Sequence, residues 1–130
     1  MHRHTELTPV SLRSFLLLTV LVPLRELPHR VRPAVGEDVT WFLRDGPVPA
    51  ELGPDVRRAT VEPSPGAVPA TGFPVRVRVV DRATTGPADD RRPVEGSAGL
   101  RDVHRAPKRF RTGPDRRDTH LLVDLAVRRA

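Results

Sequence analysis

The residues best suited to chemistry in this 130-residue chain are the seven basic side chains between Arg101 and Arg117. Guanidinium and ammonium groups bind phosphate oxygens, and arginine does so with two parallel hydrogen bonds. An aromatic ring among such cations is suited to stacking on an unpaired base, and Phe110 lies in this stretch. We therefore predict base stacking by Phe110 and phosphate contacts from the basic side chains. The predicted phosphate-contacting residues are Arg101, Arg105, Lys108, Arg109, Arg111, Arg116 and Arg117.

The excess positive charge is confined to the second half of the chain. Residues 1–65 carry eight basic and eight acidic side chains, whereas residues 66–130 carry fourteen and eight, which accounts for the whole net charge of +6. This asymmetry is typical of a segment that binds nucleic acid or another polyanion. The same counts also fit a solvated basic tail, because no helix-turn-helix, zinc-finger or RNA-recognition signature accompanies the charge.

Arginine is abundant here for a second reason, which is unrelated to binding. Of the 22 basic side chains, all but Lys108 are arginine, and the chain lacks Ile, Asn and Tyr, whose codons are rich in A and T. The composition therefore indicates a small basic protein of a G+C-rich bacterium, or a reading frame that is untranslated or was never selected to fold. The distribution of G and C among the three codon positions distinguishes a translated reading frame from an untranslated one.

Catalytic, metal and cofactor signatures are absent from the sequence. The chain has no cysteine, which excludes thiolate metal sites and cysteine nucleophiles. Its five histidines lack metal-ligand spacing, and it contains no glycine-rich nucleotide-binding motif. We therefore expect a protein that is not an enzyme, holds no cofactor or metal, and has no small-molecule substrate.

The strongest hydrophobic segment is Phe15–Leu24. Thr8-Pro9 ahead of it suits a helix start, and Pro23 would end a helix, so we expect a buried N-terminal helix. Two alternatives stay open, namely a strand, or a signal or membrane-associating segment in which basic residues precede an apolar run. The latter makes an exported or membrane-attached protein led by residues 1–24 a third functional hypothesis. Without such a segment, a cytoplasmic location is favoured.

Short strands are expected in the middle of the chain. Apolar and polar residues alternate over 38–44 and 73–81, and more weakly over 55–61, which is the pattern of half-buried strands. Within 73–81, three alternating valines are expected to pack inward and two arginines to face solvent.

Together these elements predict a small, marginal fold that is α+β or mainly β. We expect the N-terminal hydrophobic helix and a Pro/Arg-rich connector in 1–36, two or three short strands in 37–81, a disordered basic segment in 82–118, and a helix in preference to a strand in 119–130. The segment 82–118 has only four large apolar residues, too few to offset the entropy of ordering it. Fifteen prolines in the chain also indicate a core with many loops.

Overall fold

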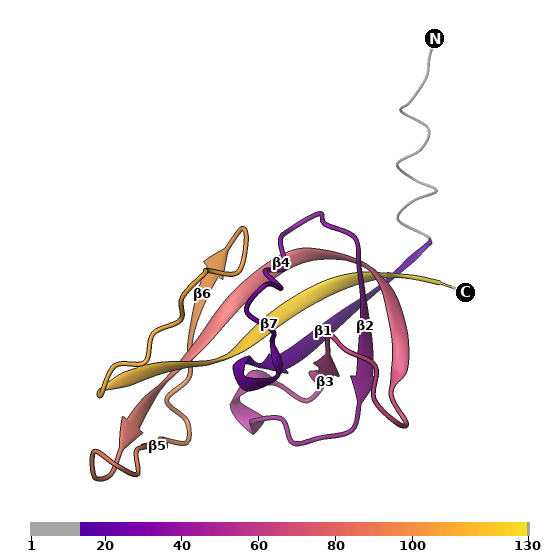
Figure 1. Ribbon diagram of the computed structural model, residues 1–130. Coiled ribbons are helices and arrows are strands. Elements are labelled where there is room, and N and C mark those ends of the chain that lie inside the picture. The colour runs from indigo at the N-terminus through magenta and orange to yellow at the C-terminus, as the bar shows by residue number, and fades with distance from the viewer. Residues whose placement is uncertain (1–13, 130) are drawn as a thin grey trace.

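The computed structural model describes residues 14–129, which form an almost entirely β protein (Figure 1). The helical segments of this part of the chain are two short 3-10 turns, η1 (Leu24–Glu26) and η2 (Ala50–Leu52). The strands are β1 (Phe15–Pro23), β2 (Val39–Arg44), β3 (Arg57–Thr60), β4 (Val68–Thr85), β5 (Arg92–Pro93), β6 (Gly99–Val103) and β7 (Arg116–Arg128).

Five of these strands close into a barrel in the order β2-β3-β1-β7-β4, and β4 pairs in turn with β2. Neighbouring strands are antiparallel except β1 and β3, which run parallel. The two longest strands, β4 and β7, lie side by side along the barrel wall (Figure 1). The first residues of β4 pair with β2, and its later residues pair with β6 and β5. One strand therefore joins the barrel to the β5–β6 extension.

The predicted N-terminal helix is wrong, and so is the α+β alternative of the fold class. Residues 15–23 form β1, which pairs with β7 along its whole length. An unbroken apolar run suits a strand that is covered on both faces as well as it suits a buried helix. In β1, Val20 and Val22 belong to one buried cluster and Leu21 to another. The expected helix start at Thr8-Pro9 lies outside the described residues.

The C-terminal third is also more regular than the sequence indicated. Residues 82–118, expected to be disordered, hold β5, β6 and the first residues of β7. The expected terminal helix is the continuation of β7. Order in 82–118 depends on distant partners: β6 pairs with β4, and the Ala106 N–H donates to the Pro33 carbonyl at 2.9 Å. The number of apolar residues within the segment gives no information about such distant partners.

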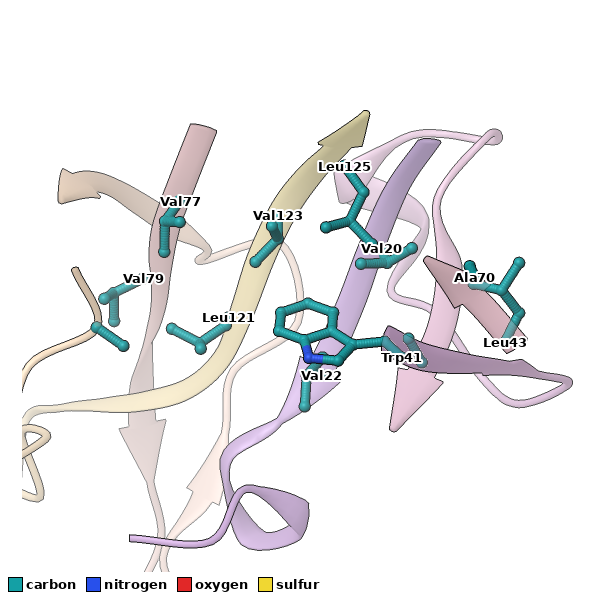
Figure 2. Close-up of a cluster of buried hydrophobic side chains, with 12 residues drawn as sticks. Val20, Val22, Trp41, Leu43, Ala70, Val77, Val79, Leu121, Val123 and Leu125 are labelled. Atoms are coloured by element: carbon teal, nitrogen blue, oxygen red, sulfur yellow. The ribbon is translucent and has the colours of Figure 1, made fainter. Parts of the chain in front are cut away.

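Inward-facing apolar side chains from all five barrel strands form the main core. Figure 2 shows the Trp41 indole in the middle of this cluster, beside Val20 and Val22. Burial of side chains of this size contributes about 1.5–3 kcal/mol each. The buried members are Val20, Val22, Trp41, Leu43, Ala59, Ala70, Val77, Val79, Ala106, Leu121, Val123 and Leu125.

A second, smaller core lies on the outer face of the barrel. Leu21, Val80 and Leu122 are buried there, one from each of three adjacent strands. The segment between β2 and β3, which includes η2, supplies the cover. Its apolar side chains in this cluster are Val48, Leu52 and Val56.

The alternation of valines in β4 is interrupted by a bulge. Val77 and Val79 are fully buried, as the pattern predicts, but Val75 is 45% exposed. The register of β4 against β7 shifts between Pro74 and Arg76. Val75 is the extra residue, which a bulge leaves unpaired in the ladder, and its side chain lies outside the inward-facing set.

Gly72 permits the close approach of β4 to its neighbours. This residue pairs with Val39 of β2 and with Val127 of β7. A Cβ atom added at Gly72 would lie 1.8 Å from the carbonyl oxygen of Ala126. Glycine in a strand interior typically marks such an approach of two backbones, and here it lies where β4 pairs with β2 and β7 at once.

Replacing Gly72 by alanine is expected to lower the free energy of unfolding by about 1–3 kcal/mol or more, because the added methyl overlaps main-chain atoms. Urea denaturation measures this change. Gly113→Ala is the matched control, since its added Cβ would lie 3.5 Å from the nearest atom, an ordinary contact, and it should change stability by less than about 0.5 kcal/mol. Equal stability of the Gly72→Ala variant and the parent would contradict this account of barrel closure.

Candidate phosphate-binding surface

Most arginines on the strands pair with carboxylates, some of which lie on neighbouring strands. The Asp124 carboxylate of β7 accepts hydrogen bonds from Arg78 of β4 and from the Thr19 hydroxyl of β1, each at 2.8 Å. Arg76 donates two hydrogen bonds to Asp102 of β6, at 2.7 and 3.0 Å, which lower the pKa of that carboxyl group. Opposite charges that face each other across strands stabilise a sheet. These arginines are therefore part of the fold.

Two of the predicted phosphate-contacting residues belong to the same network. Arg101 of β6 lies 3.2 Å from Asp118, whose side chain is fully buried, and 3.6 Å from Asp81. Arg116 of β7 also donates to Asp81. A carboxylate buried this completely requires such partners, so the two arginines are already engaged in holding β6 and β7 to the end of β4.

Arg105 and Arg117 differ in their contacts with the rest of the fold. Arg105 donates to the Glu37 carboxylate at 3.0 Å and to the Arg32 carbonyl at 2.9 Å. Arg117 is partly buried in β7, and its Nε lacks a hydrogen-bond partner among the described residues. Arg105 is therefore already engaged in an ion pair, whereas Arg117 is only partly exposed and pairs with no carboxylate within residues 14–129.

The other three predicted residues, Lys108, Arg109 and Arg111, are exposed on the connection between β6 and β7. Within residues 14–129 their side chains form no ion pair. Phe110, which lies among them in the sequence, is partly buried and packs against the main core. Its ring therefore anchors the connection and leaves the neighbouring cations in solvent.

This connection is fixed where it enters β7. The Arg111 N–H donates to the Asp118 carboxylate at 2.7 Å, and the Asp118 N–H donates to the Arg111 carbonyl at 2.9 Å. Because the backbone is held by these two bonds and by Phe110, the cations are presented from an ordered support. Ordering before binding lowers the entropy cost of a contact.

An open hollow of about 570 Å³ is lined by the segment after β1 and by residues at and beyond the ends of β2 and β3. Its lining includes the basic side chains Arg25, His29 and Arg44. A smaller hollow is also lined by His29 and is bordered by Lys108. The cations of the large hollow and of the β6–β7 connection therefore flank the segment that carries His29, and together they form the candidate surface.

Two carboxylates line the large hollow, and both are engaged. Glu26 accepts a 2.9 Å hydrogen bond from the buried Arg58 and lies 3.9 Å from Arg25. Glu62 lies 4.0 Å from Arg30, an exposed arginine outside the lining of the hollow. Arg44 has no ion pair within residues 14–129, so the hollow retains a positive charge that these carboxylates do not cancel.

Sequence reasoning missed Arg25, His29 and Arg44. The first two lie in the connection after β1, and the third ends β2. Their spacing to Lys108 along the chain follows no motif, because the barrel alone brings these three regions together. A local sequence pattern contains no signal that would have found them.

No protein-family model, curated protein or solved structure matches this chain. Within residues 14–129, no group of three or more histidine or acidic side chains is arranged to hold a metal ion. The same part of the chain contains no helix that is long and apolar enough to cross a membrane. The functional argument therefore rests on the charged surface itself.

His120, on β7, is a histidine whose pKa is shifted by its surroundings. Burial, reinforced by the positive charges of Arg58, Arg82 and Arg25, lowers the pKa of His120 to about 4. Its Nδ1 lies 2.8 Å from the Thr119 hydroxyl. The native imidazole is therefore neutral at pH values where an ordinary histidine, with a pKa of 6.5, is protonated.

This difference makes stability depend on pH. Between about pH 6.5 and pH 4 the unfolded chain binds a proton at His120 that the native protein does not, so its contribution to stability is complete above this window and is lost as the pH falls through it. His120→Gln should therefore reduce the dependence of the free energy of unfolding on pH between 4 and 6.5. His104→Gln, at an exposed histidine, is the control. Urea denaturation across this range measures both, and an unchanged pH slope in the His120 variant would refute the assignment.

Proposed function

We propose that this protein binds the phosphate backbone of nucleic acid through Lys108, Arg109 and Arg111. The observation that carries the proposal is their exposure on an ordered connection, without an acidic partner in residues 14–129, in a barrel whose strand arginines are mostly neutralised. Such cations bind phosphates without first breaking an ion pair. Release of the condensed counterions from nucleic acid then drives association.

The hollow beside the connection supports the same proposal. Arg44, which has no ion pair within residues 14–129, adds positive charge in the large hollow, which shares His29 with the smaller hollow bordered by Lys108. Duplex DNA carries one negative charge per about 1.7 Å of helix axis. A surface with cations on both sides of one segment is suited to several phosphates at once, so the proposed site extends from the connection to the hollow.

We expect this contact to depend little on base sequence. Readout of sequence requires contacts to base edges, whereas phosphate contacts position the protein without specifying bases. Phe110, the ring predicted to stack on a base, packs against the core. The proposed surface therefore presents phosphate-binding groups, and Phe110 contributes by supporting the backbone that carries them.

Point variants test this proposal better than removal of residues 101–117. That deletion would take away part of β6 and the ion pair of Arg101 with Asp118, so impaired binding would not be distinguished from impaired folding. Substitutions of exposed side chains on the β6–β7 connection leave those contacts in place.

The triple variant Lys108→Gln, Arg109→Gln, Arg111→Gln is expected to bind labelled duplex DNA more weakly and with less dependence on salt. Because three cations no longer neutralise phosphates, the slope of log K against log salt should become less steep by about 2.7, at roughly 0.9 per phosphate. Fluorescence anisotropy at several salt concentrations measures this slope.

The control variant removes the same charge from ion-paired positions. Arg76, Arg92 and Arg128 are exposed and pair with carboxylates, and their replacement by glutamine should leave most of the slope unchanged. An equal reduction of affinity in both variants would show that binding follows net charge alone, which is what codon-driven arginine enrichment predicts, and would contradict the proposed site. Absence of DNA binding by the parent protein would end the proposal outright.

A further inference from the structure

The beginning of β1 has an open edge. Figure 1 shows this part of the strand beside the end of β7. The parallel partner β3 pairs with β1 only at Val20 and Leu21. Within residues 14–129, the stretch from Phe15 to Thr19 therefore has a strand on one side and none on the other. An open strand edge presents backbone N–H and C=O groups that another strand can pair with.

The orientation of these groups follows from the pairing with β7. The Arg129 N–H donates to the Ser14 carbonyl at 3.0 Å, so even-numbered residues of β1 direct their backbone groups toward β7. Because this direction alternates along an antiparallel strand, Phe15 and Leu17 direct theirs toward the open edge. The Phe15 carbonyl accepts a 3.3 Å bond from the Arg129 side chain, and a carbonyl has a second lone pair for another donor.

Two side chains of this stretch, Leu16 and Leu17, are apolar and exposed. Leu17 is 62% exposed and Leu16 is 47% exposed. The stretch from Ser14 to Leu24 contains no charged residue, whereas β3 and β6 carry arginines. In a protein with a net charge of +6, two copies meet with least repulsion where the contact strand is neutral.

We propose that the partner of this edge is the same strand of a second copy of the chain, paired antiparallel about a two-fold axis. The register that uses the outward groups places Phe15 opposite Leu17 of the second copy and Leu16 opposite its own equivalent. Four backbone hydrogen bonds result, two in each direction. This register ends before Val20, where β3 occupies the edge, and the antiparallel arrangement places the two Arg129 side chains at opposite ends of the contact.

The contact is small, so association is expected to be weak and to depend on protein concentration. Sedimentation of the full chain over a concentration series should show a monomer–dimer equilibrium. Leu17→Lys should weaken dimerisation by at least about tenfold, because the symmetry places the new charge in the interface twice. Leu100→Lys, at a residue of β6 that is 50% exposed, should leave the dimer unchanged. A full chain that stays monomeric throughout, or equal effects of the two lysine variants, would overturn the proposal.

The proposed register can be tested by disulfide cross-linking of an introduced cysteine, because the chain contains no cysteine of its own. In this register the two copies of residue 16 lie directly opposite each other, as a pair without backbone hydrogen bonds between them. The Cα atoms of such a pair lie about 4.5 Å apart. This distance is within the range that a disulfide spans, so Leu16→Cys would bring two thiols together. Mild oxidation should give a covalent dimer of this variant and little of Leu100→Cys. Equal cross-linking of the two variants would overturn the register. This proposal does not depend on nucleic-acid binding, and neither experiment uses nucleic acid.

Discussion

The structure depends on one strand, β4, which pairs with four other strands and has partners on both sides at Gly72 and over 77–81. Its first residues pair with β2 and close the barrel, its middle pairs with β7, and its later residues pair with β6 and β5. This requires two backbones to approach closely at Gly72, where a side chain would meet the Ala126 carbonyl. Without that approach the β2–β4 pairing and the barrel core around Trp41 would not form together.

Electrostatics divides the arginines of this protein into two groups. Most of those on the strands pair with carboxylates, and the pairs with Asp81, Asp118 and Asp124 contribute to the pairing of β4, β6 and β7. Arg109 and Arg111, on the β6–β7 connection, have no acidic partner in residues 14–129. An excess of arginine over acid therefore does not spread evenly over the surface. It gathers where the fold brings no carboxylate near, and the case for phosphate binding depends on this separation.

Local sequence patterns identified several elements but assigned some of them to the wrong structure. Alternation placed strands near β2, β3 and β4, and these exist with different ends. The apolar run that became β1 was assigned to a helix because a fully buried segment has no periodicity that separates the two structures. Residues 82–118 were judged from their own apolar content, although their order comes from β4 and the connector near Pro33. The bulge at Val75 has no signal in the alternating valines.

By itself, the sequence determined the charge excess of its second half, the cations available to bind phosphate, and which residues were apolar enough to be buried. Only the tertiary structure decided which cations stay open. It neutralised Arg101, Arg105 and Arg116, and left Lys108 and its two neighbouring arginines in solvent. The physical reason is that an ion pair needs a carboxylate within a few ångströms. That proximity is set by how distant strands pair, which the composition of a segment does not encode.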